Sequence, residues 1–200
     1  MSNTLKNQTL QDGSFLGTTD LTDVQVQELS VLGPLKFVNL IVVGDTDIMG
    51  PVRESQNGTF INLSVLGSLE AERISCTSLD VAGSVKVAGL VVTGDTKISG
   101  VLEMTAQTDP KFSNKLQNLD VSAESMTLID THVEGDITVY PTLINKALKW
   151  FNKDAEQVLH LAGQTVVKGN ITFISGKGKI LQDTQAKVEG TISGVFLEAE

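Results

Sequence analysis

A short motif recurs along this chain at a nearly constant interval, and it constrains the fold more than any other feature. In most copies an aliphatic residue is followed, at steps of two, by glycine, an aliphatic residue and an apolar residue; Glu54 and Gly194 take the last place in two of them. Two adjacent copies are Val81-Gly83-Val85-Val87 and Ile98-Gly100-Leu102-Met104. The glycines of the first five copies are Gly33, Gly50, Gly67, Gly83 and Gly100, an interval of about 17 residues. A fixed short period of this kind determines the architecture.

Three further copies lie downstream, around Gly135, Gly169 and Gly190. The steps from Gly100 to Gly135 and from Gly135 to Gly169 are each close to twice the interval of the first copies. We interpret each of these steps as two periods in which one copy has degenerated. The last step, from Gly169 to Gly190, is longer than one period and breaks the pattern.

The spacing of apolar residues within the motif predicts β-strands. Alternation with a period of two places Val, Ile and Leu on one face of an extended strand and the polar residues on the other. About 17 residues suffice for two or three short strands with tight turns, which is one coil of a solenoid whose coils stack about 4.8 Å apart. The sequence therefore predicts an all-β protein, a single-chain parallel β-helix (β-solenoid) with rungs of about 17 residues.

The rungs are not uniform along the chain. Residues 1–12 are polar and are expected to form a flexible tail, followed by solenoid rungs over 13–104. The pattern lapses at 105–118, where Pro110 would interrupt a ladder, so an interrupted rung or loop is expected. Rungs resume over 119–200, and within them 141–162 is ambiguous: its apolar spacing fits an amphipathic helix or two strands about a turn, of which we favour the strands.

Composition excludes several classes of function. The formal net charge is −9, and phosphate binding needs a basic stripe, so nucleic acid is not expected as a partner. Cys76 is the only cysteine, and its place on the apolar phase suggests a core position. No apolar run is long enough to span a membrane, and no signal follows Met1. We expect the cytoplasm, with an extracytoplasmic or virion location as the alternative if a leader has been removed.

Few residues are arranged for chemistry, so the chain is expected not to be an enzyme and to need no cofactor or metal. Gly-Asp-Thr occurs at 44–46 and 94–96, but the two aspartates should lie three rungs apart, too far for one cation. The glycine-rich segment 175–179 lacks phosphate-loop spacing and is interpreted as a turn. His132 and Glu134 would share one strand face, which is too few ligands for zinc. Trp150 and Phe151 form the only adjacent aromatic pair. They are a candidate docking patch, since tryptophan is favoured at interfaces, but we favour a core or lid role.

The repeated V-x-G-x-I/L-x-V copies and the polar leading segment resemble the bactofilins, a family of bacterial cytoskeletal proteins. The resemblance covers roughly residues 29–104 and 131–195. It implies a right-handed β-helix that polymerises end to end without nucleotide, near the inner membrane, with membrane or cell-envelope components as further partners. The segment Leu-Val-Val-Thr-Gly-Asp-Thr-Lys-Ile-Ser-Gly is also similar to shaft repeats of viral and phage fibres, in which three chains wind together.

Three functions therefore remain open: a self-assembling structural scaffold, a trimeric fibre shaft or adhesin, and an extracytoplasmic carbohydrate-binding solenoid. We favour the scaffold, with the chain itself as partner in a homo-oligomer or filament. An uncapped stack leaves unpaired backbone groups at its ends. The last copy finishes at Gly194, and the apolar residues Val195, Phe196 and Leu197 follow it, so these three are the candidate self-association residues.

Overall fold

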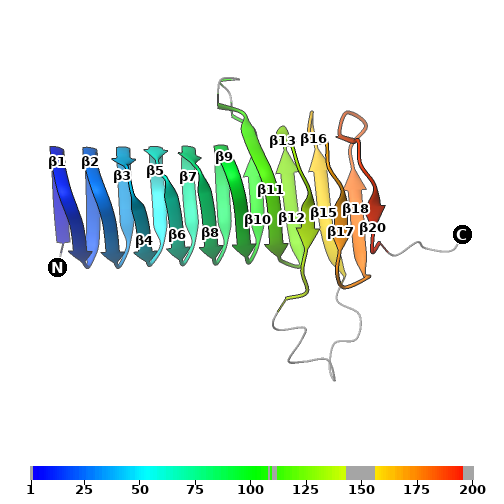
Figure 1. Ribbon diagram of the computed structural model, residues 1–200, viewed down its shortest axis with the longest axis horizontal. Helices are drawn as coiled ribbons and strands as arrows, with labels where there is room; N and C mark the ends of the chain where they lie inside the picture. Colours follow the sequence, from blue (N-terminus) through cyan, green and yellow to red (C-terminus); the bar gives the residue numbers. More distant parts are fainter. Residues whose placement is uncertain (1, 108, 110–111, 143–155, 196–200) are drawn as a thin grey trace, which may run out of the picture.

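The computed structural model describes residues 2–107, 109, 112–142 and 156–195, which form a single β-solenoid (Figure 1). The chain winds through about 10 turns, about 17 residues apart. All of the strand pairings in the described residues are parallel, and each strand except those of the first and last turns pairs with the equivalent strands of the turns before and after it. The predicted fold class, an all-β solenoid of short rungs, is confirmed.

The strands of the amino-terminal half are long where a turn is regular. They are Ser2–Leu16 (β1), Thr18–Leu32 (β2), Leu35–Val42 (β3), Asp45–Met49 (β4), Val52–Thr59 (β5), Asn62–Leu66 (β6), Leu69–Cys76 (β7), Ser78–Ala82 (β8), Val85–Ser99 (β9) and Leu102–Thr105 (β10). The strands of the carboxyl-terminal half are shorter. They are Asn114–Ser122 (β11), Ser125–Ile129 (β12), Thr131–Val133 (β13), Ile137–Val139 (β14), Gln157–Ala162 (β15), Val166–Val167 (β16), Ile171–Phe173 (β17), Gly178–Gln182 (β18), Lys187–Val188 (β19) and Ile192–Ser193 (β20).

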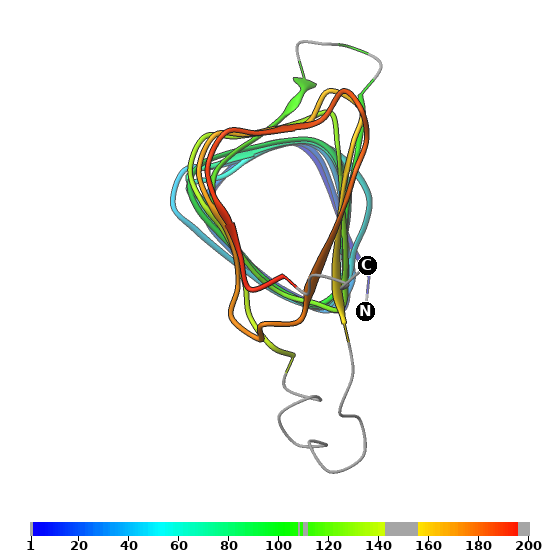
Figure 2. The same cartoon turned by 90° about the vertical axis from the view of Figure 1, so that its right-hand side faces the viewer.

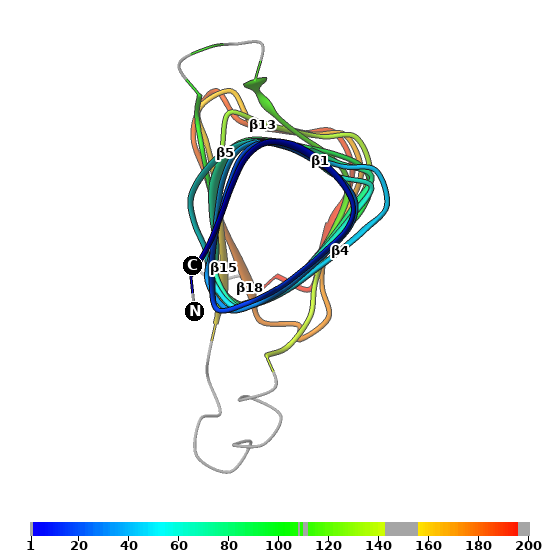
Figure 3. The same ribbon diagram turned by 90° about the vertical axis from the view of Figure 1, so that its left-hand side faces the viewer.

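Each regular turn has three faces, which give the stack a roughly triangular cross-section (Figure 2). In the third turn the first face is residues 35–38, the second 40–42 and the third 45–49. Viewed from the amino-terminal end, β15 on the first face, β13 on the second and β4 on the third follow one another clockwise as the chain recedes (Figure 3). The solenoid is therefore right-handed.

Three kinds of corner separate the faces. The glycine corner, at Gly33, Gly50 and their equivalents, joins the third face to the next turn. At Gly33 the φ angle is +137°, and a Cβ atom there would lie 2.6 Å from the carbonyl oxygen of Gly17 one turn below, so only glycine fits. The left-handed corner joins the first and second faces at a single residue with positive φ, such as Asn39. The aspartate corner joins the second and third faces at Gly44-Asp45 and its equivalents.

The core is built from columns of stacked side chains, as the alternation predicted. Val85 lies between Leu69 in the turn before and Leu102 in the turn after, and all three side chains are buried. Cys76 is also buried, in the core position expected for it. Because equivalent residues stack, each column excludes water along the length of the molecule, and burial of this aliphatic surface is the main stabilising term.

The expectation of a flexible tail at residues 1–12 is wrong. These residues belong to β1, which pairs with β2 along its whole length, from Ser2 opposite Thr18 to Leu16 opposite Leu32. Asn7 has a φ of 52° and occupies the left-handed corner, where asparagine is tolerated better than most residues. The first turn is therefore a regular rung, and its polar side chains hid its period.

The interpretation of the two long glycine steps is also wrong, because neither contains an ordinary degenerate rung. Gly169 stacks directly on Gly135, and its N–H donates to the Gly135 carbonyl at 3.2 Å. The chain between these two glycines is one turn plus an insertion at 141–156. Gly135 in turn stacks above Gln117, two turns after Gly94, so it belongs to the aspartate corner and not to the glycine corner of Gly100.

Part of each irregular segment forms a strand. Between β10 and β11 the stack is interrupted after Thr105 and resumes at Asn114, because Asn114–Ser122 pairs with β9. In the ambiguous segment 141–162, the described residues Gln157–Ala162 form a strand, β15, which pairs with β12 and β18. Residues 143–155 lie outside the described part of the chain.

Candidate functional site: the open amino-terminal end and the solenoid surface

The amino-terminal end of the solenoid is an open strand edge. Among the described residues β1 pairs only with β2, so one side of this long strand has no backbone partner there. The strand contains no proline, and its only charged side chains are Lys6 and Asp12. Long edges with few charges and no proline are the kind that pair with another strand.

The interior of the first turn is exposed at the same end. Leu5, Leu10 and Phe15 point toward the core and pack against it, but they are only partly buried. Their equivalents in the next turn, Leu21 and Val26 among them, are fully buried. The difference arises because no turn covers β1 in the described structure, so burying the rest of this apolar surface would be favourable.

The carboxyl-terminal end was predicted to carry the self-association residues Val195, Phe196 and Leu197. Val195 is partly buried and forms an isolated parallel bridge with Gly178, one turn earlier. Phe196 and Leu197 lie outside the described residues, as do Trp150 and Phe151 of the predicted docking patch. The last described turn has its inward residues partly open as well, with Ile192 41% exposed.

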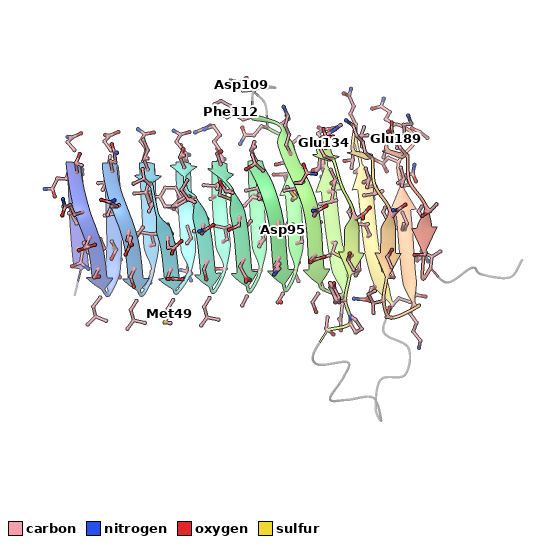
Figure 4. All side chains as sticks on the ribbon, in the orientation of Figure 1. Met49, Asp95, Asp109, Phe112, Glu134 and Glu189 are labelled. Atoms are coloured by element: carbon pink, nitrogen blue, oxygen red, sulfur yellow. The ribbon has the colours of Figure 1, made fainter. Side chains whose placement is uncertain are left out.

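The Gly-Asp-Thr pairs lie where the repeat placed them. Asp45 and Asp95 occupy the aspartate corner three turns apart (Figure 4 labels Asp95). Each accepts a hydrogen bond from an asparagine of the following turn: Asp45 from Asn62 at 2.7 Å and Asp95 from Asn118 at 3.2 Å. These bonds stack one corner on the next. In the part of the chain that the structure describes, no group of three or more His, Cys, Asp or Glu side chains could hold a metal ion.

The histidine and glutamate singled out by the sequence do meet. His132 Nε2 lies 2.9 Å from one Glu134 carboxylate oxygen, while Lys168 Nζ donates to the other at 2.8 Å. The hydrogen bond from Lys168 is the largest of the interactions that lower the pKa of Glu134. This exposed cluster, close to Glu189 at the edge of the stack (Figure 4), is a surface ion-pair ladder, and such ladders contribute little to stability.

A shallow groove of about 300 Å³ follows the first face beside Glu54, Glu70, Glu72 and Lys86. Ser55 and Thr105 contribute hydroxyl groups to its lining, and Ser55 Oγ donates to the Arg53 carbonyl and accepts the Phe37 N–H, both at 3.0 Å. That Ser55 hydroxyl closes a backbone irregularity between β3 and β5, so its two hydrogen bonds have a structural role.

Two further sequence features have structural roles. In segment 175–179, the turn expected from its glycines is present, with Gly176 at a φ of 70°. Burial raises the pKa of the Cys76 thiol to about 12, so the thiol is protonated at neutral pH.

Sequence reasoning missed the open edge of β1. A signal existed, since Leu5 and Phe15 each lie one period before an apolar equivalent in the next turn, Leu21 and Val31. No described helix is long and apolar enough to cross a membrane. No protein-family model matches this sequence, and searches of curated proteins and of solved structures found no match.

Proposed function

We propose that this protein is a non-enzymatic structural scaffold that assembles by stacking the ends of its solenoid. The observation that carries this proposal is the open edge of β1. A long edge without proline leaves backbone N–H and C=O groups directed away from β2, and another parallel strand satisfies them in the manner already used between turns.

The inward columns favour contact between the amino-terminal end of one copy and the carboxyl-terminal end of the next. The column that starts at Gly13 ends at Ile192, and the column that starts at Phe15 ends at Gly194. Head-to-tail stacking therefore places a large side chain over a glycine at both positions of the third face. It also buries the exposed parts of Leu5 and Leu10.

Proline substitutions at the edge test the proposal. The N–H of Thr19 donates to the turn above, so by strand alternation the N–H of Thr4 points toward the open end. The same alternation from Gly17 directs the N–H of Ser14 to that end. Thr4→Pro and Ser14→Pro should therefore block stacking while keeping the bonds to β2, and Ser14→Ala is the matched control.

Mass by light scattering and negative-stain electron microscopy are the measurements. We expect the natural chain and Ser14→Ala to form filaments, and both proline variants to fall to single solenoids with unchanged far-ultraviolet circular dichroism. Phe196→Arg tests the carboxyl-terminal end of the solenoid with the same measurements of mass and filament formation. A discrete trimer would instead favour the fibre-shaft hypothesis. A natural chain that stays monomeric at every salt concentration would overturn end-to-end assembly.

A further inference from the structure

Four large apolar side chains form an exposed row along the glycine corner of the first turns. Leu16, Leu32, Met49 and Leu66 are consecutive members of one column, and their side chains are 59%, 53%, 59% and 59% exposed. Figure 4 shows Met49 projecting from the lower edge of the stack. We call these four residues the apolar ridge. Its continuation in later turns is small and polar, at Ala82 and Ser99.

Folding of the single chain does not require this row. A corner residue that points outward gains no core contact, and Ser99 shows that a small polar side chain fits the position. Four successive apolar residues at one outward position therefore indicate a surface that is covered in some state of the protein.

Charges on the two sides of the ridge show which occupant fits. Two residues before each position of this column lies an outward residue of the third face. Beside the ridge itself these residues are Ser14, Ser30, Asp47 and Ser64, and in the two following turns, beside Ala82 and Ser99, they are Asp80 and Lys97. At the levels of Met49, Ala82 and Ser99, the other side of the corner carries the outward first-face residues Arg53, Lys86 and Glu103. Each of these levels thus carries opposite signs on opposite sides of the corner.

We propose that the apolar ridge is a lateral interface with a second copy of this chain, parallel and in register. A twofold axis along the solenoid brings the first face of one copy to the third face of the other. Arg53 then meets the partner copy's Asp47, Lys86 meets its Asp80, and Glu103 meets its Lys97. Ridge residues meet their own equivalents, so the apolar row is covered along its length.

The same charges disfavour the other occupants. An antiparallel pair would bring first face to first face, with Asp20 opposite Glu70, which is a like-charge contact. An anionic membrane surface attracts basic segments, whereas this chain has a net charge of −9 and acidic residues beside the ridge.

The ridge is one side chain wide and extends over three turn spacings, roughly 14 Å. The area that it can bury is therefore much smaller than the ~800 Å² per partner of a stable dimer. Two isolated copies should therefore associate transiently, and a covalent trap is the appropriate assay. The contact does not depend on end-to-end stacking.

Disulfide trapping distinguishes the arrangements. Leu16→Cys and Leu66→Cys are oxidised separately and as a mixture in which one variant carries a longer tag. All samples carry Ser14→Pro, and a parallel set lacks it, so the end contact can fail without affecting the result. In a parallel pair each introduced cysteine lies opposite the same cysteine of the other copy, so each variant forms a disulfide-linked dimer with itself. An antiparallel pair joins only Leu16→Cys to Leu66→Cys, since copies of one variant would then lie roughly 14 Å apart. Cys76 is buried and protonated, so it gives no background.

We expect each ridge variant to yield about tenfold more self-linked dimer than Ser75→Cys, an exposed control on the second face. Adding Arg53→Asp to Leu66→Cys should reduce the yield, and adding Asp47→Arg as well should restore it, because the charge pair is re-formed between copies with its signs exchanged. Yields equal to the Ser75→Cys control, mixed dimers alone, a discrete trimer, or no rescue by the second charge reversal would each overturn the proposal.

Discussion

Replacing Asn114 by leucine should destabilise the solenoid strongly, although most of the preceding residues in its column, such as Leu40, Ile74 and Leu90, are aliphatic. Asn114 is 1% exposed and opens β11, immediately after the chain returns from 106–113. Its Oδ1 accepts hydrogen bonds from the backbone N–H groups of Gly89 at 2.9 Å and Leu90 at 3.0 Å. Its Nδ2 donates to the carbonyl oxygens of Thr105 at 2.9 Å and Ile129 at 3.2 Å.

The size of the effect follows from the groups that would lose their partners. In a regular turn the backbone of the next rung would satisfy the N–H groups of Gly89 and Leu90, but the chain is absent from the stack there, and the Asn114 carboxamide replaces it. An orphaned buried donor costs about 1–3 kcal/mol. Two donors therefore cost about 2–6 kcal/mol. The loss at the Ile129 carbonyl is smaller because it keeps the hydrogen bond from Thr131 Oγ1. We expect a loss of about 4 kcal/mol, reduced by the apolar burial that leucine adds.

Urea unfolding followed by circular dichroism measures the total loss. Hydrogen exchange at the amides of Gly89 and Leu90 locates it, which matters because a stack of turns can open locally. Asn114→Asp is the informative companion. It keeps the acceptor but places a carboxylate against two carbonyl oxygens, so its folded-state pKa should lie above the usual Asp value. Because that raised pKa favours the protonated form, the variant should regain stability as the pH falls.

An Asn114→Leu protein that unfolds within about 0.5 kcal/mol of the natural chain, the scale of an ordinary surface substitution, would refute this reasoning. So would unchanged exchange at the two amides. Either result would mean that water or a neighbouring segment satisfies the donors, and that the hydrogen bonds of Asn114 do not hold the excursion to the stack.

Three other changes follow from burial. Thr46→Val should stabilise the protein by about 1 kcal/mol, since the buried Thr46 hydroxyl has no partner in the described structure. Thr165→Val should destabilise it by about 1–3 kcal/mol, because the Thr165 hydroxyl accepts from the Thr131 N–H and contacts two carbonyl oxygens. Urea unfolding midpoints of the two variants check both predictions. The raised Cys76 pKa, about 12, predicts a loss of stability as the pH rises above about 8.5, where the unfolded thiol loses its proton and the folded thiol keeps it; the loss, up to about 1.4 kcal/mol per pH unit, should be absent in Cys76→Ala. Val85→Asp should cost about 3–5 kcal/mol and Lys86→Asp little, so melting temperatures that do not separate the two would disprove the assigned strand phase.

The sequence predicted the core columns because their signal is local. Alternation with a period of two is visible within one strand, and it correctly placed Leu69, Val85 and Leu102 in one column and Cys76 inside. The first turn was missed for the converse reason. Its inward positions include Asn3 and Gly13, and its outward positions are also polar, so alternation vanished while the backbone pairing with β2 persisted. Backbone hydrogen bonds define a rung even where side chains do not reveal it.

The ends of the solenoid were predicted less well than its middle, since pairing between copies leaves little trace in a single sequence. The sequence drew attention to Val195, Phe196 and Leu197 because three apolar residues in a row cannot all face inward. It gave no such signal for β1, whose open edge consists of backbone groups common to every residue. The apolar ridge was also invisible, because Leu16, Leu32, Met49 and Leu66 align only when the rungs are in register.

The error over Gly135 has a physical cause that explains how the solenoid tolerates insertions. The glycine corner depends on close backbone contact between successive turns, as at Gly17 and Gly33, and the insertion at 141–156 replaces this corner. The left-handed corner gives way to the excursion at 106–113 and later to the turn at 162–165.

The aspartate corner, in contrast, contains no insertion from Asp45 onward in the described turns. Side chains link it upward from turn to turn: Asn118 donates to Asp95, and its own Oδ1 accepts the Asp136 N–H. The Asp136 carboxylate accepts the Asn170 N–H, and Asn170 Oδ1 accepts the Thr191 N–H. These bonds hold the corner in register while the opposite sides of the turn lengthen. The downstream glycine copies, Gly135, Gly169 and Gly190, therefore lie at the corner where no residues are inserted in the described turns.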